Sequence, residues 1–104
     1  MPLPQRDEMI EGLLSVEEDV SFSGLITGGA IVRSGVVLEL HGMVLGDLTV
    51  ERGGEAIIHG TVRGTVLNEG GWVSIFGTVD SVLDLSAESR TLIDAAALIR
   101  GRQS

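Results

Sequence analysis

The chain contains no cysteine and no tyrosine, and its 104 residues include only two phenylalanines and one tryptophan. The absence of cysteine excludes disulfide bonds, thiolate zinc sites and cysteine nucleophiles, and it fits a reducing compartment. With so few aromatic side chains, the core has to consist of valine, leucine, isoleucine and alanine, which suits narrow, regular layers. A chain of this length can build one modest core, so we expect one domain.

Basic residues are also scarce, with 7 Lys and Arg against 15 Asp and Glu, which gives a formal net charge of −8. A nucleic-acid surface needs a basic stripe that displaces counterions, so we expect no nucleic-acid partner. No apolar run approaches the roughly 20 residues that span a bilayer. Residues 1–8 also lack the basic and apolar regions of a secretory signal. We therefore expect a cytoplasmic protein without a transmembrane segment.

A repeat of 17 to 18 residues organises most of the chain. Four segments each carry an apolar strand, a glycine and a second apolar pair: 20–28, 38–46, 56–64 and 73–81. Their first glycines, Gly24, Gly42, Gly60 and Gly77, follow one another at intervals of 18, 18 and 17 residues. Glycine-rich turns come next, at Ser34-Gly35, Gly53-Gly54 and Gly70-Gly71. A weaker fifth unit over 91–98 lacks the glycines, as terminal repeats often do.

Within a unit the apolar residues alternate with a period of two. The second unit has Leu38, Leu40, Val44, Leu48 and Val50 at even positions, which indicates half-buried strands and excludes a helix. We expect its two glycines to bend the strand, because glycine accepts backbone angles that other residues avoid. Three short strands and three bends describe one rung of a parallel β-helix, with rungs about 4.8 Å apart.

The sequence therefore predicts an all-β fold, a single-stranded parallel β-solenoid of four to five rungs over residues 20–101. Two interior columns are expected: Ile26, Val44, Val62 and Val79 in one, and Ala30, Leu48, Val66 and Leu83 in the other. A left-handed hexapeptide helix would need an apolar residue at every sixth position, and a hairpin sandwich would need Asn-Gly or Asp-Gly turns. Neither pattern is present.

Residues 1–19 are expected to form a separate N-terminal leader. The apolar residues Met9, Leu13, Val16 and Val20 lie at helical spacing, with acidic residues between them, which predicts a short amphipathic helix. We expect this helix to cap the first rung. Docking of the helix on a partner, or a partly disordered leader, remains open. Its acidic face would be repelled by anionic lipid.

His41 and His59 occupy equivalent positions one rung apart, so we expect an outward ladder that Phe76 and Asp94 continue. Two imidazoles at the rung spacing could share a metal ion. With no cysteine and no third ligand in register before Asp94, we expect a structural ladder and no metal site.

Nothing in the sequence points to catalysis or a cofactor. Phosphate-binding loops lead into a helix N-terminus, whereas each Gly-Gly pair here leads into a strand. No serine lies in a Gly-x-Ser-x-Gly setting, and no acid/base pair of a carbohydrate-active or acyltransferase solenoid is evident. We therefore expect no catalytic residue, no bound cofactor and no enzyme.

Several apolar side chains are expected to face outward. Trp72 aligns with Val37 and Glu55, so it either anchors an interface or covers a corner of the coil. Outward apolar residues on the sides exceed what a monomer needs and suggest a partner surface. They are Leu45, Ile57, Leu67 and Val82.

The glycine pattern resembles that of the bactofilins, bacterial cytoskeletal proteins that form polymers. The likeness rests on the segments 42–48 (Gly-Met-Val-Leu-Gly-Asp-Leu) and 60–66 (Gly-Thr-Val-Arg-Gly-Thr-Val), with degenerate copies at 24–28 and 77–82. It covers residues 20 to about 86. The resemblance implies a right-handed triangular β-helix that polymerises through its ends without nucleotide and acts as a scaffold. The family's proline-rich tails and N-terminal membrane motif have no counterpart in this sequence, so we expect no membrane tethering.

Two functions are consistent with these features. The first is self-assembly through the C-terminal rung, where strand edges and small apolar residues would meet another copy. The residues expected at this contact are Ala95, Ala97, Leu98 and Ile99. If a helix closes the other end, the product is an isologous dimer and not a filament. The second is a small acidic immunity or antitoxin-like protein that neutralises a basic partner enzyme, with the net charge accelerating association.

Overall fold

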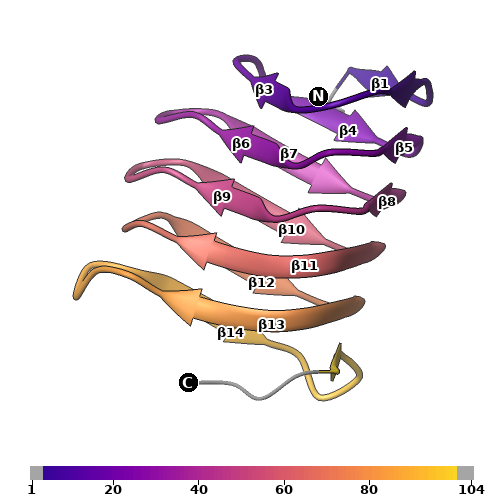
Figure 1. Cartoon of the computed structure of the whole chain (residues 1–104). Coiled ribbons are helices and arrows are strands. Elements are labelled where there is room, and N and C mark those ends of the chain that lie inside the picture. The colour runs from indigo at the N-terminus through magenta and orange to yellow at the C-terminus, as the bar shows by residue number, and fades with distance from the viewer. Residues whose placement is uncertain (1–3, 101–104) are drawn as a thin grey trace.

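The structure is a computed structural model that describes residues 4–100, and this part of the chain consists of short strands joined by turns (Figure 1). None of these residues forms a helix, and hence none forms a long apolar helix of the kind that crosses a bilayer. The strands are β1 (Gln5–Arg6), β2 (Met9–Ile10), β3 (Leu14–Val16), β4 (Val20–Phe22), β5 (Leu25–Ile26), β6 (Ala30–Val32), β7 (Val37–Leu40), β8 (Met43–Val44), β9 (Leu48–Val50), β10 (Glu55–Ile58), β11 (Thr61–Asn68), β12 (Trp72–Ile75), β13 (Thr78–Asp84), β14 (Arg90–Ile93) and β15 (Leu98–Ile99).

The chain winds into a parallel β-solenoid of about five turns, as the repeat predicts. One sheet has the order β1-β4-β7-β10-β12-β14, and a second, nine-stranded sheet holds the remaining strands. Each strand pairs in parallel with its equivalent one turn later, so that Leu38 faces Ala56 and Ala56 faces Val73. The sequence repeat is therefore the structural repeat, and every residue of a turn lies beside its counterpart in the next.

The predicted N-terminal helix is wrong. Residues 5–16 instead form β1, β2 and β3, which make the first turn of the coil and pair with β4, β5 and β6. Gly12 has a positive φ of 88° at a bend, a backbone conformation that no helix contains. Ile10 and Val16 fit the strand period equally well and complete two interior columns over Ile26 and Val32.

The same two sheets run across the boundary expected between residues 19 and 20. Residues 1–3 of the expected leader and residue 101 of the expected solenoid lie outside the described residues.

The first predicted interior column is confirmed and extends by one residue at each end. Its members are Ile10, Ile26, Val44, Val62, Val79 and Ile99. The four central members have no solvent exposure. The two end members are only partly buried, because no further turn of residues 4–100 covers them.

The second predicted column is confirmed at Ala30, Leu48 and Val66, but its next member is Val82 and not Leu83. Between Val62 and Thr65 the register shifts, so that two residues of β11 lie opposite one residue of β13. This β-bulge shifts the second half of β13 by one position from the expected register, which reverses the expected facing of its side chains. Val82 is therefore 3% exposed and Leu83 36% exposed, so both expectations about their facing were wrong.

The repeating glycines are required for close approach of the turns. A Cβ on Gly42 would collide with the carbonyl oxygen of Gly24, and a Cβ on Gly60 would collide with that of Gly42. The φ angles at these positions are not positive, so the expected role of backbone freedom at Gly42 is wrong. Positive φ occurs instead in the turns after the strands, for example 83° at Gly53.

One buried polar side chain interrupts an aliphatic column. Asn68 follows Val50 in register and is completely buried. Its Oδ1 accepts hydrogen bonds from the backbone N–H groups of Gly70 (3.2 Å) and Gly71 (2.8 Å). Its Nδ2 donates to the carbonyl oxygen of Arg90 (3.2 Å) and to Thr91 Oγ1 (3.0 Å). Asn68 therefore fastens the glycine turn of one rung to the strand of the next.

Replacing Val62 by aspartate is expected to lower the free energy of unfolding by at least about 3 kcal/mol, because the carboxylate would enter a column without water or partners. Chemical denaturation followed by circular dichroism measures the change. Arg63→Asp, at the adjacent exposed position, is the control and should stay within about 0.5 kcal/mol. Equal stabilities of the two variants would mean that Val62 faces water and that the coil is incorrect.

Asn68→Val restores the residue type found one turn earlier, yet we expect it to destabilise the protein by about 2 kcal/mol. The valine leaves the N–H groups of the glycine turn without acceptors, and a buried unsatisfied donor costs about 1 to 3 kcal/mol. The same denaturation experiment tests this, with Glu69→Ala on the exposed side of the turn as the matched control. A variant as stable as the parent would show that the turn does not depend on Asn68.

Candidate functional site

The C-terminal end of the coil exposes the hydrophobic core. β14 is the last strand of its sheet, and β15 pairs only with β13, so within residues 4–100 the outer edges of both strands lack a strand partner. Ile93 follows Ile75 in register, and Ile99 follows Val79. The two earlier residues have no solvent exposure, whereas Ile93 and Ile99 are half-buried. The aliphatic columns therefore reach the surface at this end.

Of the residues expected at a C-terminal contact, Ala97 and Ile99 pack against the end of the core. Ala95 and Leu98 are exposed, Leu98 by 57%. Sequence reasoning missed Ile93, which continues an interior column, and its neighbour Leu92, which is also 57% exposed. The alternation in β14 was the signal that could have identified both.

At the N-terminal end of the coil, a charged residue occupies the position in the repeat that Ile93 occupies at the C-terminal end. Arg6 lies in register with the buried Phe22, at the top of an interior column. Its Nε donates a hydrogen bond to Glu8 Oε1 at 2.9 Å. That bond holds the pKa of the Glu8 carboxyl below its ordinary value and raises the pKa of Arg6. A shallow hollow beside Arg6 is bordered by Glu17 and Glu18. A charge at a sheet edge discourages further pairing, so the two ends differ in chemistry.

The predicted ladder of rings is present on the outer face. The His41 and His59 rings are stacked with centroids 4.8 Å apart and planes 5° from parallel. Phe76 stacks on His59 at 5.1 Å and 13°. Asp94 continues the column, since its backbone N–H bonds to the Ile75 carbonyl oxygen as the N–H of Phe76 bonds to that of Ile58.

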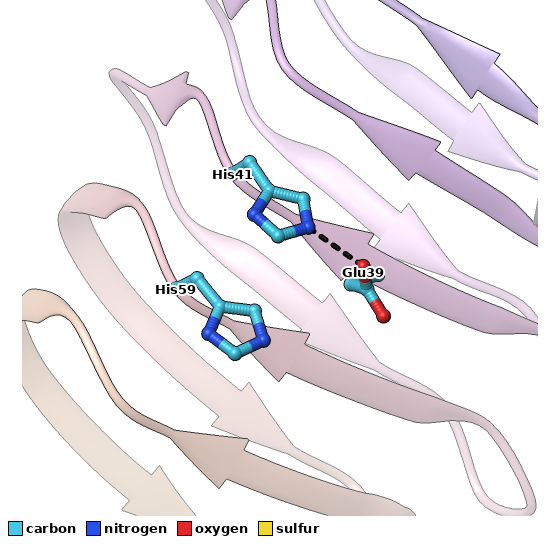
Figure 2. A group of neighbouring side chains, drawn as sticks. All are labelled: Glu39, His41 and His59. Atoms are coloured by element: carbon cyan, nitrogen blue, oxygen red, sulfur yellow. Dashed lines mark hydrogen bonds and ion pairs between the residues drawn. The ribbon is translucent and has the colours of Figure 1, made fainter.

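Glu39 adds a carboxylate to this ladder. It belongs to β7 two residues before His41, and its Oε1 accepts a hydrogen bond from His41 Nε2 at 2.6 Å. One ligand atom from each of Glu39, His41 and His59 lies within 4.8 Å of the others (Figure 2). Sequence reasoning examined only the column of the histidines and missed this residue. The strand period was the available signal, because residues i and i+2 share a face.

The apolar residues expected on the sides do not form one surface. Trp72 is 51% exposed, and its predicted alignment with Glu55 is confirmed. Ile57 lies on the same sheet and is half-buried, whereas Leu67 and Leu45 belong to the other side of the coil, in β11 and just after β8.

Trp72 does adjoin the C-terminal end. It pairs in register with Arg90, and a small apolar hollow is lined by Trp72, Arg90, Thr91 and Leu92. The exposed indole thus extends the apolar surface of the last turn onto the side of the coil.

Comparison with known proteins adds no assignment: no family model, no curated protein and no solved structure matches this chain.

Proposed function

We propose that this protein is a non-enzymatic, self-assembling scaffold protein of the bactofilin kind, a right-handed single-stranded β-helix whose C-terminal end binds a second copy. The observation that carries the proposal is the uncovered end of the core, where Ile93 and Ile99 terminate columns that are fully buried one turn earlier. Unpaired strand edges template the addition of further strands, and exposed aliphatic columns gain free energy from being covered.

The partner that best fits the C-terminal end of the coil is the C-terminal end of a second copy of the chain. Both end turns carry partly buried aliphatic side chains, but the N-terminal turn, with Ile10 and Leu14, also carries the Arg6–Glu8 ion pair and an acidic rim. Stacking the N-terminal end on Ile93 would remove the Arg6 ion pair from water, which costs several kcal/mol per ion. End-to-end contact of two C-terminal turns avoids this cost. Such a contact is isologous and closes on itself, so the product is a dimer.

We place this assembly in the cytoplasm, without nucleic acid or membrane as a partner. A second candidate function, an acidic inhibitor of a basic enzyme, is favoured by the net charge of −8 and by the 51% exposure of Trp72. Tyrosine and tryptophan often anchor interfaces. A stoichiometric complex with a basic protein, formed by a chain that is monomeric when pure, would select this candidate over the first.

We predict that the purified protein is a dimer and that Ile99→Glu makes it monomeric, because two carboxylates would be buried against each other at the contact. Size-exclusion chromatography with light scattering at several concentrations measures the mass. Since Ile99 also touches the core, Leu98→Glu at an exposed position provides a second variant that should fold normally.

Met9→Glu is the matched control, because Met9 is 59% exposed on the opposite turn and should leave the dimer intact. Circular dichroism establishes that each variant is folded. A monomeric parent protein, or a dimer that survives both C-terminal substitutions, would contradict the end-contact proposal.

A further inference from the structure

The geometry of the histidine ladder points to a binding site for a divalent transition-metal ion, and we propose that Glu39, His41 and His59 are its ligands. The three residues come from adjacent turns of one sheet, with Glu39 in β7 and each histidine directly after a strand, β7 or β10. Their ligand atoms already lie within 4.8 Å of one another. The site is independent of the contact at the end of the coil.

The donor atoms select the class of ion. Two imidazole nitrogens and one carboxylate oxygen suit zinc, cobalt, nickel or copper, whereas calcium and magnesium prefer oxygen ligands throughout. Three protein ligands leave at least one coordination position for water or for another molecule. The exposure of both histidines keeps this position open to solvent.

The backbone brings the ligands together, and small rotations of the side chains complete the geometry. Parallel pairing of Glu39 with Ile57 and of Leu40 with Ile58 fixes the two strands one rung apart. Zinc bonds of about 2.0 to 2.2 Å place ligand atoms roughly 3.3 Å from each other. The contact between Glu39 and His41, at 2.6 Å, therefore widens when the ion replaces the shared proton.

The His59 ring, by contrast, has to come closer to the other two ligands. Because the two rings are nearly parallel, their nitrogen lone pairs point the same way, and the His59 ring has to tilt toward the upper turn to reach the ion. Figure 2 shows one ring nitrogen of each histidine on the side where Glu39 lies and the other nitrogen on the opposite side of the ring. Phe76 stacks on the His59 ring from the next turn, so the ring has no room to tilt in that direction.

An ion in this position links β7 and β10, the third and fourth strands of the sheet β1-β4-β7-β10-β12-β14 counted from the N-terminal end. It binds the folded chain, because residues 18 positions apart meet only when the coil is formed. Binding to the native state alone raises the free energy of unfolding. Metal therefore should raise the melting temperature as well as give a binding isotherm.

The test is isothermal titration of tag-free, full-length protein with zinc chloride in a buffer that does not chelate metal. We expect one zinc ion per chain and a higher melting temperature in its presence. His59→Ala and Glu39→Gln should each weaken binding at least tenfold. Asp94→Asn, further along the same column, is the matched control and should bind as the parent does.

Cobalt chloride supplies a second readout, because visible absorption bands of bound cobalt report nitrogen and oxygen ligands directly. Absence of saturable zinc binding by the parent would overturn the proposal. Binding that persists unchanged in His59→Ala and Glu39→Gln would place the ion elsewhere and overturn it equally. The Leu98→Glu variant separates the two proposals, since it should bind zinc normally whatever its mass.

Discussion

Parallel backbone pairing between successive turns is the constraint on which the rest of the structure depends. Each residue is held beside its equivalent in the next turn, so a side chain is buried or exposed together with a whole column. The turns approach so closely that some positions admit only glycine: a Cβ on Gly42 or Gly60 would collide with the carbonyl oxygen of the glycine one turn before. A core with Phe22 as the one aromatic member among the described residues suffices here, since each column otherwise needs only one aliphatic side chain per turn.

This constraint also explains which features the sequence could reveal. Spacing alone predicted the column from Ile26 to Val79 and the stacking of His41, His59 and Phe76, because a constant period places equivalent residues together. The bulge opposite Asp80 could not be located in this way, because it changes the offset of paired residues from 17 (Val62 with Val79) to 16 (Thr65 with Ser81), a change that the spacing of the glycines does not record. The helix predicted over residues 5–20 failed for a related reason. Met9, Leu13, Val16 and Val20 fitted the helical period. The strand period was fitted by Ile10, Leu14, Val16 and Val20, and pairing with the neighbouring turn decided between the two.

Within residues 4–100, the first and last strands of each sheet have one edge without a strand partner. The difference between the two ends therefore lies in the side chains at the last position of each column. Arg6 stands where Phe22 stands one turn later, and it is held at the rim by its bond to Glu8. Ile93 and Ile99 stand at the other end and carry no charge. A charged rim disfavours further stacking and uncharged aliphatic side chains favour it, and the proposed end contact rests on this difference.

On the outer faces of the coil, too, equivalent side chains of successive turns lie side by side. Any polar residue that recurs at one position of the repeat becomes a row of identical groups at the rung spacing, which is close to the distance over which two ligands can share an ion. A row of imidazoles alone has parallel lone pairs and binds a metal poorly. Glu39 changes this, because strand alternation puts its carboxylate on the same face beside the first ring and supplies a ligand from a second direction. A solenoid thus gains a candidate metal site from two residues of one strand and a single equivalent residue in the next turn.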